Sequence, residues 1–490
     1  MTFNSFEFLI FYPIVLTAFF LLPHKFRWIM LLAASYIFYM WFSAPLFFLI
    51  LFTTVVSWLC SVIIERTDDM KKKRLCLILT LITSLGVLVF FKYYNFLVGS
   101  VMSLGSLFGA MPDLTIRNLI LPVGISFYTF QTLSYAIDVY RGDIKTEPHF
   151  GYYALFVSFF PQLVAGPIER PDNLLPQLHA EHRWDNADAL AGAKRMLAGF
   201  FKKIVVADLL ASHVNAVYNA PETATAVGVV VASCMFAVQI YCDFSGYTDI
   251  AIGCARIMGI HLMQNFDRPY QARSIKEFWS RWHISLSTWF RDYLYIPLGG
   301  SRCSSFKRWR NVMIVFLVSG LWHGAAWTFV IWGFLHGSYQ IIGGLTLPLR
   351  KKLTDKLKID RDSPGFGIYQ RIVTFVLVTF AWIFFRANSA GDLMILLRTL
   401  FTGWNVPLSE AFSAMGLTLT GALTSIFSVI AMVMLDRLVT HEEKPLPDGR
   451  FISDRVTAMG RGGVYIFAIL AAWMLLLAGD GASSFIYFQF

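Results

Sequence analysis

The chain has 490 residues, of which 56% are hydrophobic and only 15% charged, and its mean hydropathy is +0.58. A soluble protein of this length would form several domains with a far more polar surface, so the composition excludes an ordinary soluble enzyme. The net charge of +10 does not indicate nucleic-acid binding, because Lys and Arg cluster in short segments between apolar stretches, as in 66–74 and 350–361. We therefore predict an all-α polytopic membrane protein.

Apolar stretches of bilayer length recur along the chain. A hydrocarbon core of roughly 30 Å requires about 20 apolar residues in a helix. Candidate spans lie near 5–22, 28–43, 46–64, 75–97, 118–138, 151–167, 190–215, 225–259, 311–344, 366–385, 416–435 and 462–478. Some of these are too short, too polar or too long to be simple crossings. The pattern thus predicts about eleven transmembrane helices together with re-entrant or interfacial helices.

The charges of the connecting loops predict the orientation. The loops 23–27 and 65–74 both carry basic residues and are two crossings apart, which places both in the cytoplasm and the N-terminus outside. Loop 346–361 is cytoplasmic by the same rule. Counting the later spans then places 437–461 inside and the C-terminal tail, 480–490, outside.

The segment 268–310 does not fit a lipid-facing helix. Its charged residues alternate with aromatic ones: Lys276, Glu277, Arg281, Arg291 and Asp292 among Phe278, Trp279, Trp282, Trp289, Phe290, Tyr293 and Tyr295. This pattern suits the interface or a re-entrant fold that lines a cavity. An interfacial helix without chemistry is the alternative. Pro297 and the Gly299–Gly300 pair are expected to end the helix.

Ionisable residues at membrane depth are costly and are therefore functional candidates. His323 lies within a long apolar run, and Asp243 and Asp249 lie in another. His336 follows His323 by 13 residues, which is about 220° around an unbroken helix, so one straight helix would put them on different faces. His283 lies in the charged aromatic segment.

His323 has two readings from its sequence context alone. A neutral imidazole in a dry cavity can act as a general base that takes a proton from an attacking hydroxyl. Alternatively, it is a structural histidine, because Gly320 and Gly324 also allow close helix packing. The histidines lack metal-ligand spacing, so no metal site is expected. No phosphate-binding GxxxxGK[ST] loop and no GxSxG motif is present, so energy must arrive in an activated substrate.

Several longer motifs resemble those of a known protein family. "NFDRPYQARSIKEFWSRWHISLSTWFRDYLYIPLGG" (265–300) and "LVSGLWHGAAWTFVIWGFLHG" (317–337) resemble the membrane-bound O-acyltransferase superfamily. The nearest branch contains the bacterial alginate O-acetyltransferase-like proteins and the related D-alanyl transferase of teichoic acids. Similar stretches are found at 121–143, 159–170 and 241–253. The likeness runs through roughly 1–400 and implies one membrane-embedded domain, 1–490, around a central tunnel.

The resemblance implies roles for particular residues. His323 falls on the catalytic histidine, deep in a tunnel between a cytoplasmic donor site and an extracytoplasmic acceptor site. His336 falls on a following histidine that supports the site. The remaining residues are expected to line the tunnel or cavity: His283, Arg281, Asp292, Trp322, Asp243 and Asp249.

The tail ends in "FIYFQF", 485–490, which resembles a C-terminal aromatic motif of some polysaccharide acetyltransferases. By that resemblance, Tyr487 is a transient acyl carrier. A phenol, with a pKa near 10, leaves more readily than an alkyl alcohol, so its ester keeps much of the transfer potential of a thioester. The alternative is an aromatic anchor at the interface.

The resemblance implies acetyl transfer across the inner (cytoplasmic) membrane for O-acetylation of a polysaccharide such as alginate, cellulose or peptidoglycan. The donor is expected to be acetyl-CoA or another acyl thioester, with no bound cofactor. Expected partners are membrane lipid and an extracytoplasmic SGNH-type (Ser-His-Asp) O-acetyltransferase, but not nucleic acid. The alternatives are D-alanyl transfer to teichoic acid, an ion-coupled transporter that uses Asp243, Asp249 and the histidines as an ion path, and a structural scaffold for export.

Overall fold

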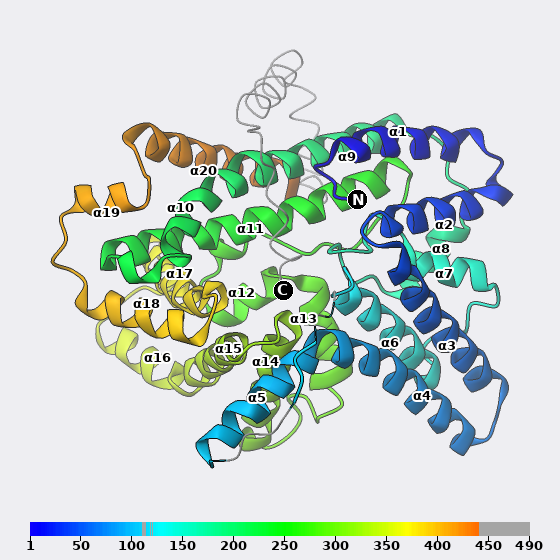
Figure 1. Ribbon diagram of the computed structural model, residues 1–490, viewed down its shortest axis with the longest axis horizontal. Coiled ribbons are helices and arrows are strands. Elements are labelled where there is room, and N and C mark those ends of the chain that lie inside the picture. Colours follow the sequence, from blue (N-terminus) through cyan, green and yellow to red (C-terminus); the bar gives the residue numbers. More distant parts are fainter. Residues whose placement is uncertain (110–113, 118, 120, 441–490) are drawn as a thin grey trace. The chain divides into compact units, whose positions relative to one another are not determined.

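The computed structural model describes residues 1–109, 114–117, 119 and 121–440 (Figure 1). All regular elements in these residues are helical, as the sequence predicts. Five helical stretches of the described chain are long and apolar enough to cross a membrane: Ala44–Arg66, Met70–Leu107, Ala226–Ile257, Pro364–Arg386 and Leu419–Arg437. The predicted number of about eleven crossings is not confirmed, and the predicted span 462–478 lies outside the described residues.

The chain divides into two compact units. The first comprises Met1–Met196 and Ile250–Met263. Within it, α3 packs against α4 and α6, and α2 packs against α7. Its helices are α1 (Phe6–Leu21), α2 (His24–Met40), α3 (Phe47–Arg66), α4 (Met70–Leu88), α5 (Tyr94–Leu107), α6 (Ile125–Arg141), α7 (Phe150–Ser158), α8 (Pro171–His179) and the first part of α9 (Asn186–Phe200).

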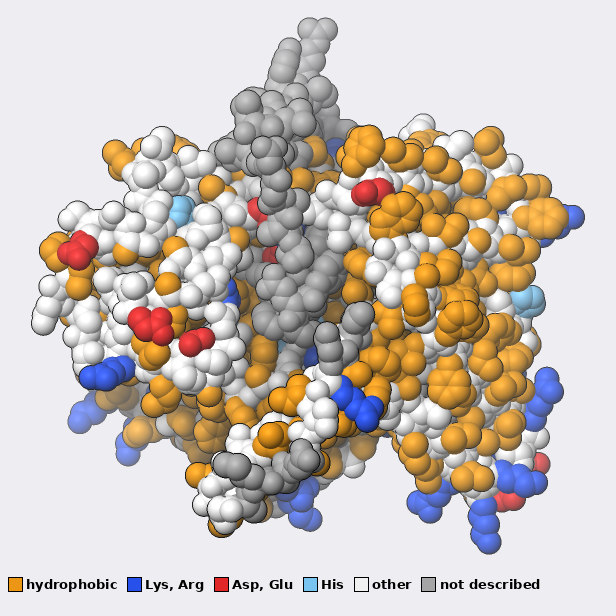
Figure 2. Space-filling model, in the orientation of Figure 1, with side chains coloured by type: hydrophobic (Ala, Val, Ile, Leu, Met, Phe, Trp, Pro, Cys, Tyr) orange, Lys and Arg blue, Asp and Glu red, His pale blue; other side chains and the backbone are white. Residues whose placement is uncertain are grey.

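The surface of the first unit is apolar where a soluble protein would be polar. Figure 2 shows hydrophobic side chains spread over the visible face of α1 to α4. Phe6 is 73% exposed and Leu21 is 79% exposed. Monomeric soluble proteins rarely expose a large apolar surface of this kind, and it fits contact with lipid.

The second unit comprises Leu197–Asp249 and the chain from Gln264 onward. In it, α14 packs against α15, α15 against α17, and α12 against both α15 and α17. Its helices are α10 (Asp208–Tyr218), most of α11 (Ala226–Ile257), α12 (Ile275–Arg281), α13 (Ile284–Phe290), α14 (Ser305–His323), α15 (Trp327–Leu345), α16 (Leu347–Lys356), α17 (Pro364–Arg386), α18 (Ala390–Thr402), α19 (Leu408–Ala414) and α20 (Leu419–Thr440). A π-helical turn, η3 (Phe201–Ala207), joins α9 to α10.

The apolar stretch 311–344 is not one crossing helix. α14 ends at His323, Gly324 is extended with φ −158° and ψ 148°, and α15 begins at Trp327. The uninterrupted helix that would separate His323 from His336 therefore does not exist. The backbone hydrogen bonding of α14 ends at the break, where Gly324 N–H donates to the Gly320 carbonyl at 3.3 Å.

The charged aromatic segment 268–310 is folded back on itself as short helices. α12 and α13 are only seven residues each and are followed by the π-helical turn η6 (Arg291–Tyr295). Helix geometry stops before Pro297, and Gly299 and Gly300 have φ of +107° and +54°. The sequence prediction that these residues end the helix is therefore confirmed.

Candidate active site

His323 is the last residue of α14, at the break before α15, and is only 4% exposed. Two glycines hold α14 and α15 close together around this break. A Cβ on Gly320 would lie 2.3 Å from the carbonyl oxygen of Phe329, and a Cβ on Gly333 would lie 2.2 Å from that of Phe316. Both distances are too short for any side chain, so glycine is required for the approach of the two backbones.

Aromatic rings surround the His323 imidazole. Its ring centroid lies 5.0 Å from that of Trp322, 5.1 Å from Trp332 and 5.5 Å from Phe385. The rings of Trp332 and Trp382 are stacked at 5.7 Å. These residues come from α14, α15 and α17, so three helices enclose the imidazole in an apolar environment.

His336 and Trp279 form a second buried pair beside Trp332. The indole Nε1–H of Trp279 donates a hydrogen bond to His336 Nδ1 at 3.2 Å. Because Nδ1 accepts, the proton of a neutral His336 lies on Nε2. Among the described residues, neither His336 Nε2 nor Trp332 Nε1 has a hydrogen-bond partner. The two sequence-predicted histidines, His323 and His336, thus both contact one tryptophan, Trp332, with ring centroids 5.1 Å and 5.0 Å from its own.

His283 is brought close to His323, with 6.4 Å between ring centroids. Its backbone is left-handed (φ 44°, ψ 56°), an uncommon conformation for a residue with a side chain. Asn265 braces this turn: its carbonyl accepts from Ile284 N at 2.9 Å, and its side chain accepts from Ser285 Oγ at 2.6 Å. Burial lowers the pKa of His283 to about 3, so its imidazole is neutral at physiological pH.

Asp243 and Asp249 of α11 form ion pairs with two lysines of η3. Lys203 Nζ lies 2.8 Å from Asp243 Oδ1, and Lys202 Nζ lies 2.7 Å from Asp249 Oδ2. Lys202 also pairs with Asp436 of α20. All five side chains are buried. The transporter alternative used these two carboxylates, together with the histidines, as an ion path, and both carboxylates are paired in this buried network.

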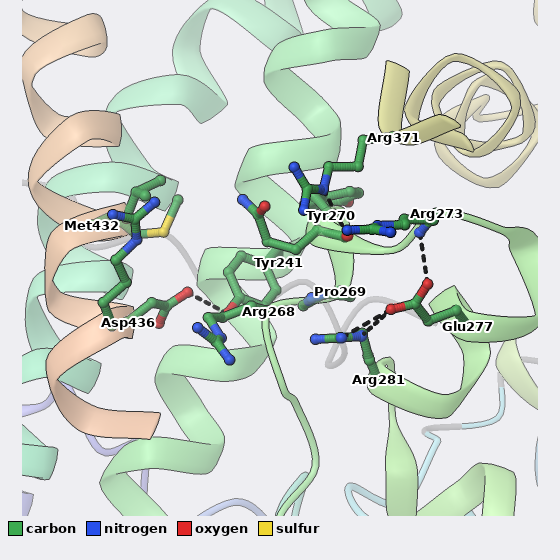
Figure 3. Close-up of a pocket in the computed structure, with 13 residues that line it drawn as sticks. Tyr241, Arg268, Pro269, Tyr270, Arg273, Glu277, Arg281, Arg371, Met432 and Asp436 are labelled. Atoms are coloured by element: carbon green, nitrogen blue, oxygen red, sulfur yellow. Dashed lines mark hydrogen bonds and ion pairs between the residues drawn. The ribbon is translucent and has the colours of Figure 1, made fainter. Parts of the chain in front are cut away.

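Arg281 lines a separate cavity of about 560 Å³, which we call the arginine pocket (Figure 3). Its charged lining residues are Arg268, Arg273, Glu277, Arg281, Arg371, Asp436 and Arg437.

The other sequence-predicted residues lie elsewhere. Trp322 lies against His323. Asp292 pairs with its neighbour Arg291 at 2.7 Å and is partly exposed. Tyr487 and the motif 485–490 lie outside the described residues.

Sequence reasoning missed the lysines and most of the arginines. Lys202 and Lys203 stand in the predicted span 190–215, so the rule that selected Asp243 and Asp249 could have found them as their counter-ions. Arg371 and Arg437 are far apart in the sequence, and only the fold brings them together with Arg268 and Arg273. No three His, Cys, Asp or Glu side chains lie close enough to hold a metal ion in the part of the chain that is described.

These features define a multi-pass helical membrane protein with a buried histidine cluster inside an aromatic cage. Residues 141–385 match the family model described as MBOAT, membrane-bound O-acyltransferase family. The chain is 38% identical to the probable alginate O-acetylase AlgI of Pseudomonas aeruginosa over 94% of its own length and 86% of the relative's. It therefore belongs to the membrane-bound O-acyltransferase family and is an acyltransferase.

Two further relatives indicate how broad this similarity is. A peptidoglycan O-acetyltransferase of Helicobacter pylori is 34% identical over 75% of this chain and 72% of that protein. A teichoic acid D-alanyltransferase of Bacillus subtilis is 31% identical, over 45% of this chain and 58% of that protein. Similarity to O-acetyl-transferring relatives thus extends over much more of the chain than similarity to the D-alanyl-transferring one.

Proposed function

We propose that this acyltransferase moves an acetyl group from cytosolic acetyl-CoA across the cytoplasmic (inner) membrane for O-acetylation of an extracytoplasmic polysaccharide. The observation that supports this proposal most is the near-full-length similarity to proteins named as alginate O-acetylases, combined with the buried His323 in its aromatic cage. Alginate, cellulose and peptidoglycan remain candidate acceptors. An SGNH-type transferase outside the membrane would place the acetyl group on the sugar.

His323 is the base in this proposal, and Tyr487 is the acyl carrier. An imidazole nitrogen of His323 takes the phenolic proton of Tyr487 as the phenol oxygen attacks the thioester carbonyl. The carbon–sulfur bond then breaks, and the imidazolium returns the proton to the CoA thiolate. The tyrosyl ester next gives its acetyl group to the extracytoplasmic transferase. His336, held by Trp279, and His283, held by the Asn265 turn, position the walls of the site.

Transfer of label from [¹⁴C]acetyl-CoA to the protein in lipid nanodiscs tests the proposal. Peptide mass spectrometry is expected to find acetyl on Tyr487 in the wild type, and none in Tyr487→Phe or His323→Ala. Label on another residue in Tyr487→Phe would contradict the carrier role. CoA release by the wild type but not by His323→Ala, without label on any of the three proteins, would keep His323 as base and make 485–490 a docking tail.

D-alanyl transfer is the second candidate, supported by the match to the teichoic acid D-alanyltransferase. That reaction would require a carrier-protein thioester in place of acetyl-CoA. Absence of CoA release from acetyl-CoA, together with turnover of a D-alanyl carrier thioester, would favour it.

A further inference from the structure

Almost every side chain of α16 (Leu347–Lys356) is exposed, although the helix carries a row of leucines. Thr354 is its one buried residue. Leu349 is 69% exposed, Leu353 is 53% exposed, and Leu357, directly after the last helical residue, is 58% exposed. We call these three side chains the leucine row. A helix of only ten residues is marginal in water unless its apolar face is packed, and none of the described residues buries the leucine row.

The leucine row occupies one face of α16, and cations flank it on both sides. Its members are four residues apart, which places them within about 80° of one another around the helix. At about 100° per residue, Arg350 lies about 60° to one side of the centre of the row, and Lys356 and Lys352 lie about 60° and 100° to the other side. Lys351 and Asp355 lie on the opposite face. An apolar stripe bordered by Lys and Arg is typical of helices that lie in a membrane interface.

The segment 347–361 is also strongly basic. It contains six Lys or Arg residues and two Asp residues, which gives it a net charge of +4. Asp355 is already paired with Arg361, with 2.7 Å between Oδ1 and Nη2. Lys352 and Lys356 are exposed and have no carboxylate partner among the described residues. The flanks of the leucine row are therefore complementary to an anionic partner.

The position of α16 in the chain keeps it near the membrane surface. α17, which follows it, is one of the helical stretches long and apolar enough to cross a membrane, and it begins at Pro364. Only the segment 357–363 connects the two helices, so α16 stays close to the surface at which α17 enters the bilayer. By the positive-inside rule this is the cytoplasmic surface, whose leaflet carries anionic lipids and a negative potential.

We propose that α16 lies in the cytoplasmic membrane interface and binds anionic phospholipids, with the leucine row among the acyl chains and Lys352 and Lys356 on the phosphates. A lipid interface provides both kinds of contact at once, because acyl chains cover the leucines while the long lysine side chains reach the headgroups. This inference does not depend on the identity of the acyl donor or acceptor.

Lipid bound at α16 also acts on the helices that enclose His323. α16 connects α15 to α17 within the second unit (Figure 1). Trp332 of α15 and Phe385 of α17 both contact the His323 ring, and Trp382 of α17 stacks on Trp332. An α16 anchored in the interface therefore holds the connected ends of two helices of the aromatic cage at the membrane surface.

Quenching of a fluorescent probe by brominated lipids tests the proposal. The probe is attached to Leu353→Cys in a cysteine-free background, in nanodiscs that contain phosphatidylcholine and phosphatidylglycerol. The composition stays fixed, and the acyl chains of one lipid or of the other carry the bromine. At equal mole fractions, brominated phosphatidylglycerol should quench at least about twofold more strongly than brominated phosphatidylcholine, because one Lys near an anionic surface favours the anionic lipid about fivefold. The same probe on Lys351→Cys, on the opposite face, should be quenched little by either lipid.

Neutralising the flanking lysines separates headgroup binding from apolar contact. Lys352→Gln and Lys356→Gln should each raise, by about fivefold, the mole fraction of phosphatidylglycerol needed for half-maximal quenching at position 353. Lys72→Gln, an exposed lysine of α4, is the matched control and should leave that mole fraction unchanged. Raising the salt concentration to about 1 M should remove the preference for phosphatidylglycerol while phosphatidylcholine still quenches, because salt screens charges and not apolar contacts.

Equal, weak quenching at positions 353 and 351 would overturn the proposal and would indicate that a soluble partner or water covers the leucine row. Equal quenching by the two brominated lipids, or unchanged half-maximal quenching in both lysine variants, would overturn the binding of anionic headgroups. Thermal unfolding at the wild-type temperature shows that each variant is folded. Acetyl transfer does not enter these measurements, so their outcome is independent of the proposed roles of His323 and Tyr487.

Discussion

At the scale of single residues, the free-energy cost of a buried charge in a membrane protein depends on whether the charge has a partner of opposite sign. Lys202 is held between Asp249 and Asp436, and Lys203 between Asp208 and Asp243. Breaking a buried ion pair by removing one partner leaves an uncompensated charge, which costs about 3–5 kcal/mol. The network therefore fastens α20 to η3, and α20 in turn supplies one side of the arginine pocket.

The substitution Lys202→Met tests this role. It leaves two carboxylates buried without their counter-ion, so we expect a loss of about 3–5 kcal/mol in stability, seen as a clearly lower thermal unfolding temperature in detergent. Lys276→Met removes an exposed lysine of α12 and serves as the control. Equal unfolding temperatures for both variants would contradict a structural role for the network.

Glu169 of the first unit gives a pH-dependent prediction. Its carboxylate is fully buried, and burial raises its pKa to about 7, although Asn173 and the Met263 N–H donate to it. Because the folded-state pKa is above the ordinary value of 4.5, the stabilisation is complete below pH 4.5 and is lost as pH rises through 7. Unfolding temperature should therefore fall between pH 5.5 and 8, and less so in Glu169→Gln. Identical pH profiles for the two proteins would refute this assignment.

At the scale of elements, the α14–α15 hairpin is the feature that builds the site. The sequence identified the apolar run, the lone His323 and its flanking glycines, but it could not show that the run breaks at Gly324. Hydropathy is the same for one long helix and for two short antiparallel ones, so periodicity does not separate them. The break is decided by the close packing at Gly320 and Gly333, which depends on residues 13 positions apart.

Gly320→Ala and Gly333→Ala test the hairpin. Each new methyl group would meet a backbone carbonyl at under 2.5 Å, so we expect about 1–3 kcal/mol of destabilisation and reduced acetyl transfer as His323 shifts. Gly343→Ala, on α15 like Gly333, is the matched control, because its Cβ would meet nothing within 4 Å. That variant should be neutral or slightly more stable, since alanine favours helix over glycine. Wild-type behaviour of Gly320→Ala would mean that the hairpin does not need this contact.

At the scale of the whole molecule, composition alone was enough to predict an all-helical membrane protein. The three-dimensional arrangement of its charged side chains could not be predicted from the sequence. The helix ends at 21, 66, 257 and 386 lie close to those predicted from apolar runs, because hydropathy and charge both change sharply there. The arginine pocket, in contrast, draws residues from four separate parts of the chain: Tyr241, the segment 268–281, Arg371 and the segment 432–437. The closeness of these pocket residues follows from tertiary packing, so no local sequence pattern indicates it.

Orientation is a prediction at this scale. The positive-inside rule places loop 346–361 in the cytoplasm and the tail 480–490 outside. In a cysteine-free background, a membrane-impermeant maleimide added to intact spheroplasts should label Ser483→Cys and leave Lys352→Cys unlabelled until the membrane is opened. The reverse pattern would invert the topology and would remove Tyr487 from the side where an acetyl group must emerge.

The most direct test of the account is single-turnover CoA release from acetyl-CoA by the wild type and by His323→Ala, with CoA affinity measured on the same nanodisc samples. A general base contributes typically 10²- to 10⁴-fold, so we predict release at least about a hundredfold slower in His323→Ala with unchanged CoA affinity. Release at the wild-type rate by His323→Ala would contradict the account, because the buried imidazole would then be a structural residue of the α14–α15 hairpin.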